Sequence, residues 1–580
     1  MENPTAPQPE ARPEEYPEAP KTGGYTVPSY AQPAYTMPPP GSVPPYAAAP
    51  YSYRPPERPQ IPSDRRDLIL AAVLLVASVL SADLSLFGGF RLGFSISYLL
   101  IFCCGAVYLR HTGSYSRPYG LFCAVAALAG AGVYVLHDDP LINLFTFFGV
   151  LFLTMLALVE STGVGKHDSG EITAVADAVH MFLIRPLIHV GTSIGAIFRV
   201  QRDDRIEKRR FGGALIGLLC ALPVLAILVS LLVSADAAFE GLLKLTVLDR
   251  LAEVFVSLAI GLVLFCVLYS RLFSLRHELK EDAVPSRPAN AAHGLDALPV
   301  NTFLGAICAV YVVYLFSQLA YFFSAFSGIL PEEFSVAEYA RRGFGEMCAV
   351  CAINLVLIAC ASVFSKHKDG KAPLSTRLFC LFILLFSLGL VAVSVSKMAL
   401  YIHSFGMTRL RILTNVFMLM LACVLIFIGI RLFAVRFPYM RASVIAVALI
   451  GLATAYIDVD TTVARYNVTA YQNGTLEEID IETLGDLSEG AIPYLITLRE
   501  ELPLEDDLTR ALFYKLTEFA DVDLDKKTVT APAYDWREFN LDRRNARRLL
   551  LDNADSIVRN YTGLPDYSDR IYDYDYDYDY

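Results

Sequence analysis

The sequence predicts an all-α fold, a polytopic transmembrane helical bundle of about eleven spans followed by a small helical extracytoplasmic domain. Composition is the first observation behind this prediction, because 54% of the 580 residues are hydrophobic, only 18% are charged, and the mean hydropathy is +0.44. A soluble domain carries about 25% charged residues. The other two observations are a series of long apolar runs between residues 68 and 457, and a change to acidic composition after them. A chain with this pattern buries its apolar surface in lipid.

Residues 1–62 precede the first apolar run and predict a disordered, Pro-rich cytoplasmic arm. Seventeen of the 32 prolines and seven tyrosines lie in the first 60 residues. Such a segment buries too little apolar area to fold by itself. The stretch "PYAAAPYSYRPPERP" within it has the composition of a polyproline II ligand, and a plain spacer is the simpler alternative.

Residues 63–457 form the predicted membrane domain, in which eleven apolar runs follow one another. Each run is about long enough, at 1.5 Å per helical residue, to cross about 30 Å of hydrocarbon. The expected spans are 68–88, 92–109, 120–136, 140–160, 212–234, 253–274, 301–323, 343–364, 375–397, 411–433 and 438–457.

Lysine and arginine set the expected orientation, because they gather in alternate loops, such as those before the first span and before the fifth. Cytoplasmic loops carry the excess of Lys and Arg. The N-terminus is therefore expected inside the bacterial cytoplasmic membrane, and an odd span count places the C-terminus outside. One outer loop, 398–410, breaks the rule because Lys397, Arg409 and Arg411 flank it. Two apolar stretches are not expected to cross: 172–199 suits a cytoplasmic interfacial helix, and 235–252 the outer face.

Residues 458–563 predict a small acidic helical domain outside the membrane, and residues 564–580 a disordered Tyr-Asp tail. From residue 458 to the end, 28 acidic residues face 13 basic ones, a net charge of −15 in a chain whose total is −11. Apolar residues recur at helical spacing in this region. The only tryptophan, Trp536, is expected to pack in the core of the domain.

A first charged cluster lies between the seventh and eighth spans. Glu338, Arg342 and Glu346 share one helical face at i, i+4, i+8 spacing, Arg341 is one turn from Glu338, and Asn354 continues the stripe inward. Exposed pairs of this kind contribute only about 0.3–0.5 kcal/mol each. The cluster therefore has two interpretations: paired charges that anchor a helix at the headgroups, or a polar pathway or ligand pocket.

A second cluster lies on the same expected side, in "SVSKMALYIHSFGMTRLRILTN". It contains Lys397, Tyr401, His403, Arg409 and Arg411. This basic set has three candidate partners: the acidic residues 332–346, the acidic C-terminal domain, and anionic lipid headgroups. An anionic ligand is a further alternative.

Several strings resemble the recurrent motifs of a bacterial multi-pass membrane family, the domain of unknown function numbered 4173, which is related to the one numbered 4153. They are "SADAAF", "AYFFSAFSGILPEEFSVAEYARRGFGEM", "LYIHSFGMTRLRILT", "VARYN" and "LSEGAIPYL". The resemblance covers about residues 210–500. It implies a multi-pass protein with a short helical C-terminal region, and it implies no reaction, because none is assigned to the family.

Other signals fail, and we expect no metal, cofactor or nucleic acid. The stretch "DVDLD" at 521–525 lacks the Gly and Glu that a calcium-binding EF-hand loop requires. The 11 cysteines all lie in apolar segments, where they are expected as buried small side chains. No phosphate-binding loop, zinc spacing or catalytic triad is legible.

Three functional hypotheses remain. The first is a sensing or scaffolding protein at the cell envelope, which meets an envelope partner on one side and a cytoplasmic protein through the arm on the other. The second is a transporter with Glu346, Asn354 and Lys397 along a polar route, although transporters usually show midplane charges or repeats. The third is a membrane enzyme acting on a lipid-linked substrate with His403 or Glu338 as base. We favour the first and do not expect an enzyme.

Overall fold

The computed structural model describes residues 64–110, 118–162, 173–199, 246–277, 295–327, 344–366, 371–502 and 506–561. The expected N-terminal arm, the expected span 212–234 and the whole of the expected Tyr-Asp tail lie outside these ranges.

Within the described ranges, nine helices are long and apolar enough to cross a membrane, and a tenth apolar helix is shorter. The tenth is α3 (Pro118–Val133). The nine lie in α1 (Arg65–Gly88), α2 (Leu92–Arg110), α4 (Pro140–Thr162), α9 (Thr246–Arg276), α10 (Ala297–Ser327), α12 (Phe344–Phe364), α13 (Leu374–Phe405), α14 (Arg409–Phe433) and α15 (Tyr439–Ile457). Most of their bounds lie within a few residues of the expected spans, although α9 and α13 are longer, and the helices indicate an integral membrane protein.

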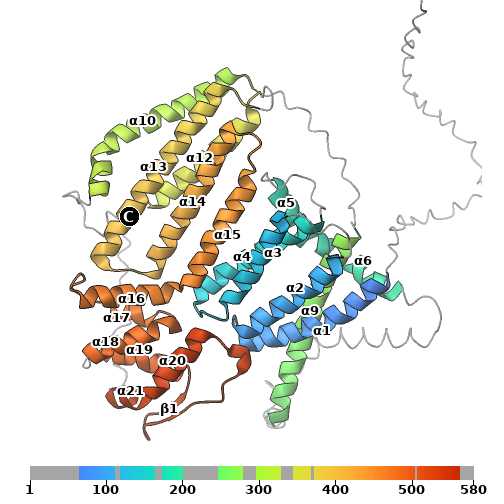
Figure 1. Cartoon of the computed structure of the whole chain (residues 1–580), viewed down its shortest axis with the longest axis vertical. Helices are drawn as coiled ribbons and strands as arrows, with labels where there is room; N and C mark the ends of the chain where they lie inside the picture. Colours follow the sequence, from blue (N-terminus) through green and yellow to red (C-terminus); the bar gives the residue numbers. More distant parts are fainter. Residues whose placement is uncertain are drawn as a thin grey trace, which may run out of the picture. The chain divides into compact units, whose positions relative to one another are not determined.

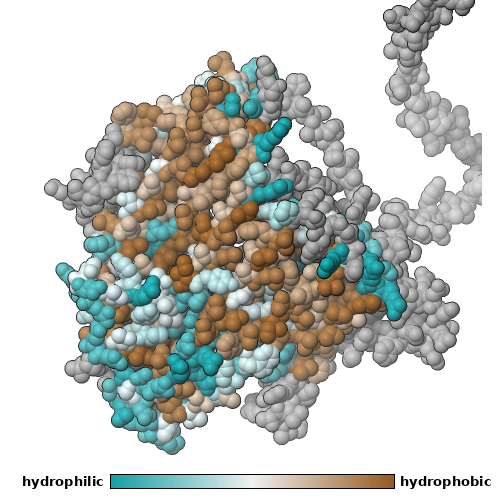
Figure 2. Space-filling view, viewed as in Figure 1, coloured by the Kyte–Doolittle hydropathy of each residue, from teal (hydrophilic) through white to brown (hydrophobic). Residues whose placement is uncertain are grey.

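Many helices that are neighbours in the sequence pack side by side, and several pairings join helices further apart in the chain (Figure 1). Helices α1 and α2, α3 and α4, α13 and α14, and α14 and α15 form such neighbouring pairs. Helix α1 also packs along α9, and α10 along α13. Figure 2 shows hydrophobic residues over these helices and hydrophilic residues gathered over the last helices of the chain.

The α1–α9 contact depends on a glycine that lets two backbones approach. A Cβ atom placed on Gly261 would lie 2.6 Å from the Cα of Val79 on α1. We therefore expect Gly261→Ala to push the two helices apart and to destabilise the fold by about 1–3 kcal/mol.

A thiol-reactive dye that reports thermal exposure of buried cysteines such as Cys123 measures this loss. Gly389→Ala is the matched control, because a Cβ at Gly389 meets nothing within 4 Å. The control is expected to be neutral or to stabilise its helix by about 1 kcal/mol. An equal effect of the two substitutions would contradict the close α1–α9 packing.

Helix α13 is longer than the expected span and absorbs most of the expected loop 398–410. The helix continues to Phe405 and ends at Gly406, which has φ +74°. Glycine adopts this left-handed conformation without the strain that a Cβ would bring. Tyr401 and His403 therefore lie on the last turns of a helix, and the expectation of a loop at these residues was wrong.

The stretch 173–199 is helical throughout, as α5 (Thr173–Val179), a π-helical turn η1 (His180–Ile184) and α6 (Arg185–Arg199). It packs against α9, where Arg271 lies 3.5 Å over the ring of Phe182 and donates to its carbonyl oxygen. It is not among the nine long apolar helices.

After α15 the chain forms a compact group of short helices, the C-terminal helices hereafter. They are α16 (Val459–Gln472), α17 (Ile481–Gly485), η3 (Glu489–Ala491), α18 (Ile492–Glu501), α19 (Asp506–Thr517), η4 (Trp536–Glu538), α20 (Leu541–Asp552) and α21 (Ala554–Asn560). Their apolar core also takes in Val133, Ile142 and Ala455 from the ends of α3, α4 and α15. The C-terminal helices are thus packed onto the membrane helices through a shared core.

Two details of this region differ from the expectations. A two-stranded antiparallel hairpin, β1 (Asp521–Asp523) and β2 (Thr528–Thr530), interrupts the helices. Asp523 accepts hydrogen bonds from the backbone amides of Asp525 and Lys526, which closes the hairpin turn. Trp536 is 57% exposed, so the expectation that it packs in the core was wrong.

A buried carboxylate joins α1, α2 and α9 at one end of the bundle. Asp67 is fully buried, and Tyr108 and Arg276 donate to its Oδ1 at 2.6 and 2.7 Å. The other oxygen, Oδ2, lies 3.0 Å from Nε2 of His277. At the opposite end of α1, Asp83 pairs with Arg537 of η4 at 3.2 Å. The C-terminal helices therefore meet α1 at the end away from Asp67, about 24 Å along the helix at 1.5 Å per residue.

Candidate functional site

Buried charges concentrate where the C-terminal helices meet the ends of the membrane helices. The loops 89–91, 134–139 and 406–408 and the bend at residue 458 all contribute to this contact. We call it the ionic junction, and its charged members are Arg91, His137, Asp138, Asp139, Arg409, Asp458, Asp460, Glu489, Glu538, Asp542 and Arg543.

Arg409 forms the strongest pairing of the ionic junction. Its Nε donates to Oδ1 of Asp460 at 2.7 Å, and one terminal nitrogen bonds the second oxygen of the same carboxylate. Asp139 lies 3.6 Å from Nε. Both carboxylates are almost completely buried, at 0% and 2% exposure. A bidentate guanidinium is well suited to such a site, because it offers two parallel donors and stays charged.

Asp460 also fixes the next turn of the C-terminal helices. Its Oδ2 accepts the backbone amide of Ser488 at 2.7 Å. Asn467, two turns further along α16, exchanges two hydrogen bonds of 2.7 Å with the backbone of Met407. A Cβ at Gly406 would lie 2.7 Å from the amide oxygen of Asn467, so only glycine fits there. Helix α16 is thereby bound to the turn between α13 and α14.

Three of the strings that carry the family resemblance meet at this point. "LYIHSFGMTRLRILT" supplies Arg409, "VARYN" supplies Asn467, and "LSEGAIPYL" supplies Ser488. Asp460 bonds the first and third of these residues, and Asn467 bonds the turn that precedes Arg409. These three strings are thus parts of one contact.

Asp458 makes the turn from the last membrane helix into α16. Its φ is +54°, a left-handed conformation that Asp tolerates better than most residues. Its Oδ1 accepts the amide of Thr461 at 3.2 Å, which caps α16. A Cβ on Gly490 would overlap the other carboxylate oxygen. Residues held in such conformations cluster at functional sites.

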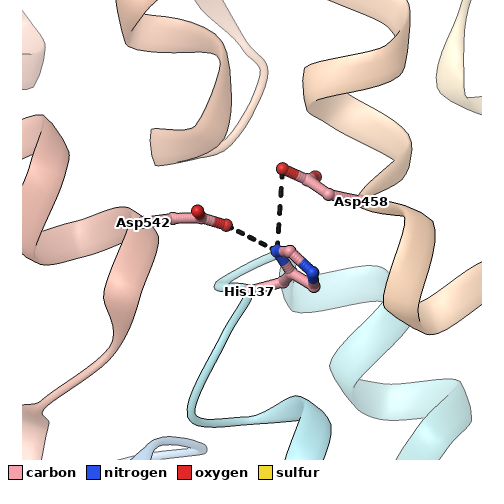
Figure 3. Close-up of side chains that lie close together, drawn as sticks. All are labelled: His137, Asp458 and Asp542. Carbon is pink, nitrogen blue, oxygen red and sulfur yellow. Dashed lines mark hydrogen bonds and ion pairs between the residues drawn. The ribbon is translucent and has the colours of Figure 1, made fainter.

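His137 lies between two carboxylates that come from distant parts of the chain (Figure 3). Its Nδ1 is 2.8 Å from Oδ2 of Asp542 and 3.7 Å from Oδ2 of Asp458. Its Nε2 is 3.2 Å from the carbonyl oxygen of Tyr456, which only accepts, so Nε2 carries a hydrogen. A neutral ring would then point a lone pair at two carboxylates. The geometry therefore favours a positive charge at Nδ1.

A proton on Nδ1 of His137 supplies this positive charge. Burial lowers the pKa of His137, but the hydrogen bond to Asp542 and the charges of Asp542 and Asp458 outweigh burial and raise it. For carboxyl groups burial has the opposite effect, and it raises the pKa of Asp458, Asp139 and Glu489. The imidazolium form of His137 is the one that the junction stabilises.

The same three side chains offer the ligand atoms of a divalent cation. The nitrogen and the two carboxylate oxygens lie within 4.8 Å of one another. A metal-bound histidine commonly donates its other N–H to a carbonyl, as Nε2 does here. The 2.8 Å separation of Nδ1 and Asp542 is a hydrogen-bond length, however, so the observed arrangement fits the proton better than a metal.

Because the ionic junction stabilises protonated His137, we predict that the junction weakens as rising pH removes this proton. The folded chain holds this proton more tightly than the unfolded chain, so the stabilisation is complete below the ordinary pKa of 6.5 and is lost as pH rises through the raised value. The raised pKa of Asp458 acts with the same sign but from its ordinary pKa of 3.8 upward, because its ionisation in the folded state is disfavoured. We expect denaturation midpoints to fall from pH 6.5 upward.

The measurement is chemical denaturation at a series of pH values in the purified protein. His137→Gln is the control, because glutamine keeps hydrogen-bonding capacity without a proton that titrates in this range. The fall above pH 6.5 is expected to disappear in the variant. A fall of equal size in both proteins would contradict a role for His137.

The predicted residues of the first charged cluster are only partly described. Glu338, Arg341 and Arg342 lie outside the described residues. Glu346 is exposed in the first turn of α12. Asn354 is fully buried, accepts from the Tyr311 hydroxyl at 2.6 Å and donates to Ser387 Oγ at 2.9 Å. Asn354 thus joins α10, α12 and α13, and Glu346 lies two turns away from it on α12.

The second charged cluster divides into residues at the junction and residues on α13. Arg411 lies 3.9 Å over the Tyr401 ring and donates to the carbonyl oxygens of Phe405 and Gly406. His403 is exposed, and Lys397 lies on the same helix. Three partners were considered for the basic residues, and Arg409 pairs with one of them, the C-terminal region, through Asp460.

The sequence did not predict six residues of the ionic junction: His137, Asp138, Asp139, Asp458, Asp460 and Asp542. One signal was available, because "HDDP" at 137–140 places three ionisable residues between two apolar runs. Asp458 and Asp460 stand directly after the last span. The partner of His137 is 405 residues away in the chain, so no local pattern identifies it.

A family described as "Domain of unknown function (DUF4153)" matches residues 123–498. This range contains Arg409, Asp460, Asn467 and Ser488. No curated protein and no solved structure matches the chain.

Proposed function

Since this chain belongs to the DUF4153 family, whose description gives no activity, we propose its function from the ionic junction. The chain is proposed to be an integral membrane protein that acts as a sensor or a scaffold at the bacterial cell envelope. In this proposal the C-terminal helices meet a partner outside the cytoplasmic membrane, and the junction transmits that contact to the membrane helices. Membership of the related family 4173 is part of this proposal, and residues 458–563 are the proposed extracytoplasmic domain.

One observation carries the proposal: a nearly fully buried ionic and apolar contact binds the C-terminal helices to the ends of α3, α4, α14 and α15. A domain tethered only by a flexible linker would move independently of the membrane helices. A domain fixed at several helix ends cannot shift without moving them. Rigid coupling of this kind suits transmission of a binding event.

The sidedness of the proposal follows from the two ends of α1. Asp67 meets the end of α9 at Arg276, whereas Asp83 meets the C-terminal helices through Arg537. The Arg65 end of α1 is the proposed cytoplasmic side, because the basic residues precede it. The C-terminal helices then lie outside.

The transport hypothesis has less support. Both polar groups of the Asn354 side chain are used by Tyr311 and Ser387, as in an interhelical packing contact. Glu346 is exposed and does not take part in those hydrogen bonds. The enzyme hypothesis relied on His403 and Glu338, of which the first is exposed and the second lies outside the described residues.

Growth competition in a gene-deleted strain under envelope stress tests the proposed function. The strain receives the native chain, Arg409→Ala or Glu346→Gln at equal membrane abundance. We expect Arg409→Ala to lose the competitive fitness that the native chain restores, and Glu346→Gln to retain it. Full fitness of Arg409→Ala together with loss in Glu346→Gln would overturn the proposal in favour of a route through Glu346.

A further inference from the structure

The segment 535–542 crosses the ends of four membrane helices. Phe539 accepts the amide of Leu92 at 3.1 Å, and Asn540 donates to the carbonyl of Tyr134 at 3.0 Å. The amides of Leu541 and Asp542 donate to the carbonyls of residues 135 and 136. We call 535–542 the strap, because its backbone is bonded to both the α1–α2 turn and the α3–α4 turn.

The strap lies directly on the helix ends. A Cβ on Gly88, the last residue of α1, would lie 2.9 Å from the carbonyl oxygen of Arg537. The Arg537 guanidinium reaches Asp83 at 3.2 Å. Trp536 directly precedes Arg537 in the chain. The carbonyl oxygen and guanidinium of Arg537 both lie against α1, so Trp536 is close to the end of that helix.

Trp536 is the only tryptophan of the chain, and at 57% it is the most exposed large hydrophobic side chain among the described residues after α15. Leu541, also on the strap, is 42% exposed. Leu86 and Phe90, at the adjacent end of α1, are 45% and 38% exposed. Exposed apolar side chains are therefore present both at this end of α1 and on the strap.

We propose that the strap is a membrane-interface anchor, in which Trp536 inserts at the phospholipid headgroup level of the leaflet above α1 and α2. Tryptophan favours this level because its ring is apolar and its indole N–H donates a hydrogen bond. The occupant is the phospholipid bilayer itself. The inference requires only that α1 and α2 cross a bilayer, and it goes beyond the proposed function.

The anchor gives the ionic junction a second attachment to the membrane. The strap ends at Asp542, whose carboxylate bonds His137. Insertion of Trp536 thus holds one side of the His137 site against the lipid surface. A change in lipid packing would act on the strap before it acts on the rest of the C-terminal helices.

The native chain in phospholipid nanodiscs provides the test, because its fluorescence reports one tryptophan. We expect a lipid spin label placed just below the headgroup to remove at least half of the emission. A label at the end of the acyl chain, and aqueous iodide, are expected to remove much less.

The control moves the probe to α19, which contacts other C-terminal helices. It combines Trp536→Phe with Tyr514→Trp, at a side chain that is 45% exposed. Iodide should quench this probe and neither lipid label should. The anchor is overturned if iodide quenches Trp536 as strongly as the control, or if Trp536 resists iodide and both lipid labels, which would mean that protein covers it.

Discussion

Arg409→Ala is expected to destabilise the contact between the C-terminal helices and the membrane helices by about 3–5 kcal/mol. The substitution removes the guanidinium that neutralises Asp460 and Asp139, and these carboxylates are 0% and 2% exposed. An uncompensated buried charge costs far more than the net value of an exposed pair. Denaturation followed by the fluorescence of Trp536, which lies in the C-terminal helices, measures the loss.

Arg411→Ala is the matched control for this prediction. Arg411 lies two residues after Arg409 on α14, stacks on the Tyr401 ring and donates to two backbone carbonyls. Its removal leaves no buried carboxylate behind, so the expected cost is about 1 kcal/mol. The double variant Arg409→Ala/Asp460→Ala is expected to be less destabilised than the sum of its single variants. Strict additivity would contradict a direct ion pair.

The second large effect is expected at the opposite end of α1. Asp67→Ala removes a fully buried carboxylate that Tyr108, Arg276 and His277 share. Among the described residues, Asp64 is then the one carboxylate left beside Arg276, at 3.2 Å and with its side chain 53% exposed. We expect a loss of about 3–5 kcal/mol, seen as earlier thermal exposure of the buried cysteines to a thiol-reactive dye.

Asp64→Ala tests whether this effect belongs to burial. It removes the exposed partner of the same arginine, and exposed pairs contribute about 1 kcal/mol or less. The dye should therefore report nearly native thermal stability for Asp64→Ala. Equal losses at Asp64 and Asp67 would show that burial of the carboxylate does not matter.

The membrane helices could be predicted because hydrophobicity alone determines them. A span requires about 20 apolar residues, and the observed helix α14 (Arg409–Phe433) differs from the expected 411–433 by two residues. Helix α13 was underestimated because its last turns carry Lys397 and His403, which a hydropathy window excludes. The turn at Gly406 was the better signal, since glycine commonly ends helices.

The site was predicted in part. The basic residues at 397–411 pointed toward an acidic partner, and Arg409 indeed bonds Asp460. The sequence did not indicate which carboxylate it meets, because Asp460 is one of many acidic residues after residue 457. Pairings such as His137 with Asp542 depend on how the C-terminal helices dock. Helical periodicity carries no information about that docking.

The position of Trp536 was predicted wrongly, because its side chain was expected in the core and is exposed. A tryptophan in a small soluble domain usually belongs to the core. Beside a membrane the same side chain favours the interface. The hairpin 521–530 was missed because three aspartates and two lysines mask its short alternation.

The account depends on the C-terminal helices and the Arg65 end of α1 lying on opposite sides of the membrane. Thiol labelling of Leu524→Cys and Arg66→Cys in intact spheroplasts, with a membrane-impermeant maleimide, tests this most directly. Both positions are exposed, and the native chain measures background from its own cysteines. We predict labelling of Leu524→Cys without lysis and of Arg66→Cys only after lysis. The reverse pattern, or labelling of both positions from one side, would contradict the account.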